Sequence, residues 1–147
     1  MNNQIGTRVS GRSVLPWHGW VLSGLFLLYS IAATYDYIMS VSVGQSYYRA
    51  SGMTEAQINY FSNVPDWAVV GWTLSVFGGL LGSLALLFRM RAASTLFAFS
   101  LLGSLGYILY TLVLSAGREA MGGLWFMPFV VAALTCLMIF YCRRWLK

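Results

Sequence analysis

The chain has 147 residues, of which 59% are hydrophobic and only 9% are charged. An ordinary soluble domain is about 45–50% apolar and about 25% charged, so this chain has too few polar residues to cover a soluble core. Its 16% aromatic content also excludes a disordered polar chain. The composition therefore predicts an integral membrane protein.

Four stretches are long and apolar enough to cross a bilayer, whose hydrocarbon core of about 30 Å needs about 20 helical residues. Their apolar residues surround each helix rather than marking one face, as in helices that contact lipid and each other. The sequence has none of the alternating segments that strand spans need. We therefore expect one all-α membrane domain over residues 1–147, a bundle of four transmembrane helices at about 17–43, 67–88, 92–115 and 124–142.

The first span has a second interpretation, as a signal peptide. Arg8 and Arg12 precede a compact apolar run, and Ser30-Ile31-Ala32 resembles a cleavage site. The segment stays compatible with the membrane to Tyr35, however, which is too long for a typical signal core. We expect a retained signal anchor.

Basic residues gather on one side of the four expected spans. Seven of the nine Lys and Arg residues fall there, and only Arg49 and Arg118 fall on the other side. All four carboxylates lie at or near that other side: Asp36, Glu55, Asp66 and Glu119. Because cytoplasmic loops retain Lys and Arg, we expect both termini in the cytoplasm. The net charge of +5 is then explained by the membrane topology. The sequence has no cluster of basic residues that would indicate a nucleic-acid partner.

The only long loop, residues 44–66, contains the signature of a short helix. Thr54 fits the N-cap and Gln57 the N3 position of a capping box. We expect a short amphipathic helix at about residues 54–62, resting on the outer membrane surface or capping the bundle. Pro65 should end this element and open the second span from a first-turn position.

Small residues follow one side of the second span at four-residue intervals. Such ridges let helix backbones approach closely in lipid. The third span also contains small residues, including Gly103, so we expect spans two and three to touch along these faces. The ridge and its neighbours are Gly71, Ser75, Gly78, Gly79, Gly82 and Ser83.

Pro128 lies a few residues into the expected fourth span. There it would remove an amide donor and crowd the carbonyl of Leu124, which favours a kink. Gly122 and Gly123, just before it, predict an irregular entry to this span.

Asp36 is the first candidate for a binding role, since an ionisable group in a span is a functional hypothesis by default. It lies about 28 Å beyond Trp17 in a helix, near the outer headgroups. We favour a solvated Asp36, or one paired with Arg49 or Arg118, over a proton or ligand site. Asp66 fits the first turn of a helix, where the dipole favours a carboxylate. The full set of ligand or ion candidates is Asp36, Glu55, Asp66, Glu119, Arg49 and Arg118.

The sequence offers little for catalysis. His18 is the only histidine and lies on the opposite side from the carboxylates, so no His–carboxylate pair activates a hydroxyl. No Cys or carboxylate cluster stands near it with metal-ligand spacing, and no phosphate-binding glycine motif is present. Cys136 and Cys142 are about 9 Å apart along one helix, too far to bridge. We expect a non-enzymatic protein without metal or cofactor.

Several short stretches of the first three spans together resemble a known family: Tyr35-Asp36-Tyr37-Ile38-Met39, Pro65-Asp66-Trp67 with Trp72, Gly78-Gly79-Leu80-Leu81-Gly82-Ser83, Leu87-Phe88-Arg89 and Phe99-Ser100-Leu101. This family comprises small bacterial four-span inner-membrane proteins, largely uncharacterised and often given an automatic sugar-transporter label. The layout is also loosely similar to DoxX-like four-helix proteins. The resemblance implies four spans in a bacterial inner membrane, and it assigns no functional residue.

Three functions are left open. The first is a helper or accessory module that packs with itself or with a larger membrane complex, which the small-residue ridge favours. The second is a small-solute transporter or ligand-binding bundle that uses the outer carboxylates. Four helices enclose little space, so transport would need an oligomer. A lipid-active enzyme ranks last. Membrane lipids are the partners that all three share.

Overall fold

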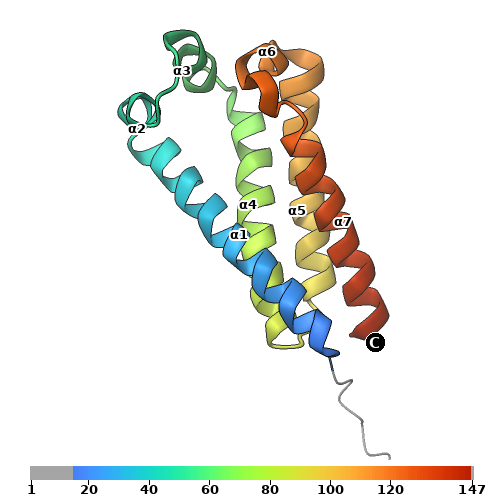
Figure 1. Ribbon diagram of the computed structural model, residues 1–147. Helices are drawn as coiled ribbons and strands as arrows, with labels where there is room; N and C mark the ends of the chain where they lie inside the picture. The colour runs from blue at the N-terminus through green and yellow to red at the C-terminus, as the bar shows by residue number, and fades with distance from the viewer. Residues whose placement is uncertain (1–14, 147) are drawn as a thin grey trace, which may run out of the picture.

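A computed structural model describes residues 15–146, and within that range the chain is all-helical, without strands. Four helices are long and apolar enough to cross a membrane (Figure 1). They are α1 (Trp17–Ser42), α4 (Asp66–Leu87), α5 (Ala93–Ile108) continued by the π-helix η1 (Leu109–Leu114), and α7 (Met127–Trp145). The predicted four-helix membrane fold is therefore confirmed. Arg8, Arg12 and Lys147 lie outside the described residues.

Short helices gather at one end of the bundle, which we call the loop end; the opposite end, next to Pro16 and Leu146, is the terminal end (Figure 1). The loop end carries α2 (Gln45–Ala50), α3 (Glu55–Ser62), α6 (Gly117–Met121) and the 3₁₀ turn η2 (Gly122–Leu124). Helix α3 is the one expected at 54–62, with Thr54 as its N-cap. Helix α2 was not predicted.

The long helices pack in an open order: α1 on α4, α4 on α5, and α5 on α7. The first and last members meet at the terminal end, where the His18 ring lies 5.9 Å from Tyr141 and 6.1 Å from Trp145. A Cβ at Gly19 would collide with the Tyr141 hydroxyl there. From this contact the two helices diverge toward the loop end (Figure 1).

Glycines bring α4 and α5 into close contact, as the small-residue ridge indicates. A Cβ built at Gly78 would lie 2.8 Å from the Ser100 amide nitrogen, and one at Gly82 would lie 2.9 Å from the Phe97 ring. Gly71 and Gly103 face each other's carbonyl oxygens. Gly79 is turned differently from the rest of the ridge, because its nearest neighbours are the Ser100 and Ser30 hydroxyls, at 3.5 and 3.6 Å, on α5 and α1.

Two prolines occupy positions other than those expected. Helix α7 begins at Met127, three residues later than predicted, so Pro128 lies in its first turn and not inside the span. An amide is not needed for intrahelical bonding at that position, and the expected kink is therefore wrong. The irregular entry is present as η2, in which Gly122 has a φ of 57°. Pro65 is the N-cap of α4 and not its first helical residue.

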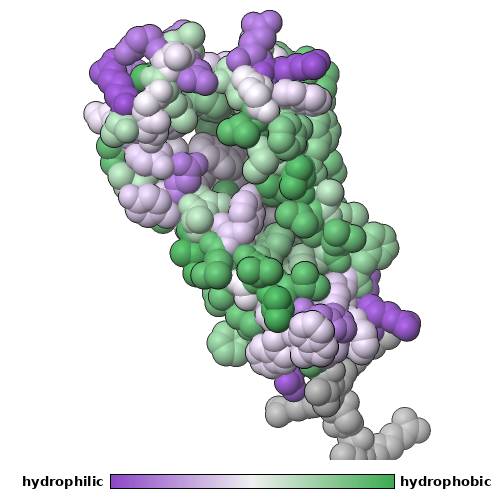
Figure 2. All heavy atoms as spheres, in the orientation of Figure 1, coloured by the Kyte–Doolittle hydropathy of each residue, from purple (hydrophilic) through white to green (hydrophobic). Residues whose placement is uncertain are grey.

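Polarity and packing both vary along the bundle. On the face shown in Figure 2, hydrophobic side chains form a belt between hydrophilic ends. The buried core lies in the terminal half, where Phe26, Leu86, Phe97 and Cys142 from the four long helices pack together. The loop half has no comparable apolar cluster among the described residues, and this is where the bundle opens.

Candidate ligand cavity

A cavity of about 540 Å³ lies at the loop end, in the space that α1 and α7 leave between them. This volume falls within the usual range of ligand pockets, about 300–1,000 Å³. Tyr29, Ala33 and Asp36 line it from α1, and Met127 and Val131 line it from α7. Figure 2 shows the hollow below α3 and α6. We expected a bundle centre filled by side chains; the divergence of α1 leaves this part of it open.

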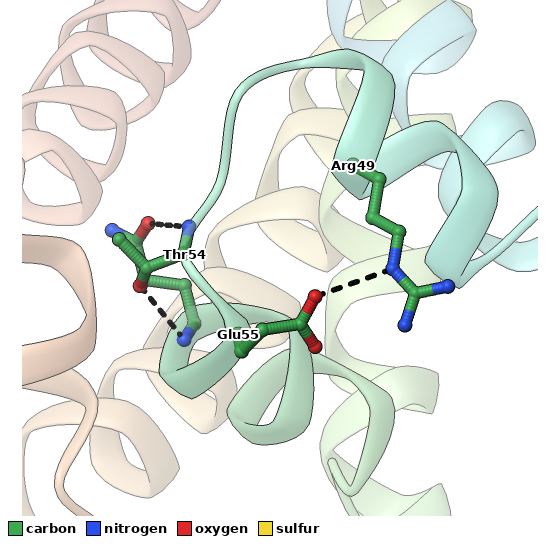
Figure 3. Close-up of polar contacts among 4 residues, drawn as sticks. Arg49, Thr54 and Glu55 are labelled. Atoms are coloured by element: carbon green, nitrogen blue, oxygen red, sulfur yellow. Dashed lines mark hydrogen bonds and ion pairs between the residues drawn. The ribbon is translucent and has the colours of Figure 1, made fainter.

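Helix α3 forms the roof of the cavity and is fixed by one glutamine. The Gln57 backbone amide donates to the Thr54 hydroxyl, while Gln57 Oε1 accepts from the Thr54 amide at 2.9 Å (Figure 3). Gln57 Nε2 then donates to the carbonyl of Ala120 on α6, also at 2.9 Å. The predicted capping box is confirmed. The same side chain also ties α3 to α6 above the gap.

A second polar contact holds this roof at its far side. The hydroxyls of Tyr60 on α3 and Ser115 lie 2.6 Å apart. Burial is the main cause that raises the pKa of the Tyr60 phenol. Gly117, which opens α6, is packed so closely that a Cβ would collide with the Thr111 carbonyl.

Aromatic rings form one wall of the cavity. Trp72 on α4 lies 5.7 Å from Tyr107 on α5, centroid to centroid, and 5.1 Å from Tyr37 on α1. The Tyr37 hydroxyl is 2.6 Å from the Thr73 hydroxyl. These contacts place the indole between three helices.

Hydroxyl groups form the floor. The Ser75 and Ser104 hydroxyls are 2.6 Å apart, and the Ser100 hydroxyl donates to the Ser75 carbonyl at 2.6 Å. A void of about 20 Å³ lies beyond this floor, bounded in part by Ser30 and Thr135. Thr135 is fully buried, and its hydroxyl donates to the Val131 carbonyl. The floor is therefore polar: the Ser100 and Thr135 hydroxyls donate within the protein, whereas the Ser75–Ser104 pair uses one of its two protons in its mutual hydrogen bond.

Asp36 lies exposed at the rim, and it is the only carboxylate in the described part of the chain that lines the cavity. The Tyr47 hydroxyl on α2 donates to Asp36 Oδ1 at 2.7 Å. This hydrogen bond is the main cause that raises the pKa of the Tyr47 phenol, because ionisation would put two negative charges together. Neither expected arginine pairs with Asp36. Arg49 Nε lies 3.4 Å from Glu55 Oε1 (Figure 3), and Arg118 lies over the Trp125 ring at 4.6 Å.

The other charged candidates do not converge on the cavity. Arg49 and Glu55 form an exposed surface pair, of a kind worth little to stability. Asp66 lies in the first turn of α4, the position at which the helix dipole favours a carboxylate. Glu119 lies exposed on α6. Asp36 is therefore the one member of the candidate set that contributes charge to the cavity.

Sequence reasoning did not identify the neutral residues of this site. Trp72 entered only through the family resemblance, Ser75 was predicted as a packing residue and Gln57 as part of a cap, while Tyr107 was not considered. That these residues border an open cavity depends on how α1 leans away from α7, which no local pattern encodes. One signal was available: Trp72 and Ser75 are three residues apart, so both lie on one face of the second span.

Among residues 15–146, no three His, Cys, Asp or Glu side chains lie close enough together to hold a metal ion. Comparison with protein-family models, with curated proteins and with solved structures found no match to this chain. The resemblance noted from the sequence stays a prediction. The fold and the cavity define the class: a helical multi-pass membrane protein whose bundle opens at one end.

Proposed function

We propose that this protein is a non-enzymatic protein of a bacterial inner membrane that binds a small amphipathic ligand at its loop end. The observation that carries the proposal is the cavity itself. It combines aromatic walls, a hydroxyl floor, and one carboxylate that has no cationic partner among residues 15–146. Such a site favours a ligand with an apolar body and an ammonium group.

The distribution of charge supports an orientation with the loop end outside. Within the described residues, four arginines lie at the terminal end, namely Arg89, Arg91, Arg143 and Arg144. The loop end carries two arginines and four carboxylates. Cytoplasmic segments are enriched in Lys and Arg, so we infer that both termini face the cytoplasm and the cavity faces outward.

A binding measurement with paired probes tests the proposal. Alkylammonium and arylammonium compounds, each with its neutral alcohol analogue, are added to the full chain in detergent, and thermal stability and binding heat are measured. We expect the ammonium probes to bind more tightly than the alcohols. Asp36→Asn should weaken ammonium binding by about tenfold, because a hydrogen bond to a charged group contributes about 1.5–3 kcal/mol.

Glu119→Gln is the matched control, because Glu119 is an exposed loop-end carboxylate that does not line the cavity. It should leave the affinity unchanged. Trp72→Ala should weaken ammonium and alcohol probes alike, since it removes a wall and no charge. An absence of binding by every probe, or an equal effect of Glu119→Gln and Asp36→Asn, would refute the proposal.

Transport of the ligand is a separate step and needs a second conformation. The terminal end is closed in this structure by Tyr141 against Gly19 and by His18 near Trp145. Uptake into liposomes distinguishes binding alone from transport. If Asp36→Asn abolishes binding but leaves uptake intact, the cavity is not part of a transport path.

A helper or accessory role is the second candidate. Its original support was the small-residue ridge, but Gly71, Gly78 and Gly82 are used within the chain, against α5. What favours this role is the unfilled space between α1 and α7, where the cavity of about 540 Å³ and the groove of about 640 Å³ could take side chains of another helix. A stoichiometric partner recovered in mild detergent would support this role over ligand binding.

A further inference from the structure

We infer that the natural ligand is a membrane lipid with an ammonium headgroup, which enters sideways from the bilayer between α1 and α7. This inference rests on the proposed function and names the ligand class. The cavity would hold the headgroup, and an acyl chain would follow the gap between the two helices.

The first argument is continuity between the cavity and the lipid-facing surface. A groove of about 640 Å³ runs between α1 and α7 below the cavity. Tyr29 lines both spaces, so they adjoin at that side chain. The groove walls are apolar over most of their length, with Leu22 and Leu25 on α1 facing Leu134 and Leu137 on α7, and Arg144 lines the groove near the terminal end. A molecule that extends from the cavity into the groove would therefore pass the Tyr29 side chain, which is 40% exposed.

The second argument is length. Asp36 and Leu25 are eleven residues apart on α1, which is about 16 Å along a helix axis. One leaflet occupies half of a hydrocarbon core about 30 Å thick, or about 15 Å. A lipid with its headgroup at Asp36 would therefore have its chain end near Leu25. The contact between Gly19 and Tyr141 closes the gap just beyond that point.

The third argument is charge. Among residues 15–146, Asp36 is the only charged residue that lines the cavity, and Tyr47 occupies only its Oδ1 atom. A carboxylate has room for several donors, so Oδ2 can accept from an ammonium group. The two loop-end arginines are engaged elsewhere, with Glu55 and with Trp125. An anionic headgroup would therefore meet a carboxylate without a compensating cation.

The experiment uses the full chain in nanodiscs that contain equal amounts of phosphatidylethanolamine and phosphatidylglycerol with identical acyl chains. Lipids retained by the protein after transfer to detergent are counted by native mass spectrometry. We expect phosphatidylethanolamine to be retained preferentially. Asp36→Asn should reduce that preference by about tenfold, the effect of one hydrogen bond to a charged group.

Two tryptophan substitutions test the sideways route. Leu25→Trp places a bulky ring in the groove, and it should abolish retention of both lipids. Leu102→Trp is the matched control, because Leu102 is 64% exposed against 61% for Leu25 but lies on α5 outside the groove. It should retain lipid as the unmodified chain does. Equal behaviour of the two variants would overturn the route.

Other outcomes separate this inference from the proposed function. If soluble alkylammonium probes bind but no lipid is retained, the lipid inference fails while the proposed function stands. If neither binds, both fail. Equal retention of the two lipids would refute the assignment of an ammonium headgroup. Recovery of a stoichiometric partner protein that excludes lipid from the groove would show that the groove holds a protein and not a lipid.

Discussion

The contact between α4 and α5 and the gap between α1 and α7 lie in the same bundle but are built from different side chains. Along α4, glycines at positions 71, 78 and 82 let the backbone of α5 or the Phe97 ring approach without an intervening Cβ. Along the gap, α1 offers one glycine in contact with α7, Gly19, and then larger residues such as Leu22 and Tyr29. Small residues alone do not bring the helices together, because Ala32 and Ala33 on α1 line the open cavity.

This difference shows how a membrane protein can hold a cavity without losing its fold. Apolar burial gives little net drive between helices in lipid, so close backbone packing and hydrogen bonds must hold the bundle. The α4–α5 contact supplies both, through its glycines and the Ser75–Ser104 hydrogen bond. Helices α1 and α7 therefore need not pack against each other over most of their length. Their loop half is available for a ligand.

The largest effect is expected from overpacking the close contact. Gly78→Leu places side-chain atoms where the Ser100 backbone already lies within 2.8 Å of a Cβ, and overpacking costs about 1–3 kcal/mol or more. We expect a large loss of thermal stability and of monodisperse yield in detergent.

Gly24→Leu on α1 is the control, since a Cβ there meets nothing within 4 Å. Gly79→Ala should fall between the two, because its nearest neighbour is a hydroxyl at 3.5 Å that can adjust. Equal stability of the Gly78 and Gly24 variants would show that close packing between α4 and α5 does not hold the bundle more strongly than the residues along the gap.

A smaller effect is expected at the roof of the gap. Thr54→Ala removes the N-cap of α3, which costs about 1 kcal/mol in typical helices. Amides of α3 should exchange faster with deuterium, while amides of α4 and α5 should be unaffected because the close contact does not depend on this roof. Thr54→Ser keeps the hydroxyl and should preserve protection. Faster exchange throughout the bundle would show that the roof and the close contact are not independent.

The sequence predicts these two regions unequally, for a physical reason. Spans, the capping box and the α4 ridge follow from periodicity and spacing within single segments, so Thr54, Gln57 and Gly78 are readable from local pattern. The cavity depends on the angle between α1 and α7, helices far apart in the chain. Asp36 was located at the loop end correctly, but its partner was not. Tyr47 reaches it from α2, a helix without a recognisable start signal, while Arg49 turns to Glu55.

The hydrogen bond between Ser75 and Ser104 tests how much a polar contact contributes to the packing of α4 on α5. Such bonds between membrane helices average about 0.6 kcal/mol in double-mutant cycles. Ser75→Ala, Ser104→Ala and the double variant should give a coupling energy of about that size in reversible detergent unfolding. A matched cycle with Ser104→Ala and Thr135→Ala should give none, because the Thr135 hydroxyl donates within α7. Coupling in the second cycle alone would place the interhelical bond elsewhere.

The smallest effect is a titration at the rim of the gap. Asp36 holds the pKa of the Tyr47 phenol above its ordinary value near 10, so the hydrogen bond between them is present at neutral pH. It is lost as pH rises above 10 through the raised pKa of the folded state. Asp36→Asn should return this pKa toward the ordinary value, as measured by tyrosinate absorbance with Tyr47→Phe as the reference that isolates the signal. Because Tyr47 lies outside the α4–α5 contact, its ionisation should loosen α2 over the gap and leave protection of α4 unchanged. A titration curve that is identical in wild type and Asp36→Asn would show that α2 does not close on Asp36 in solution.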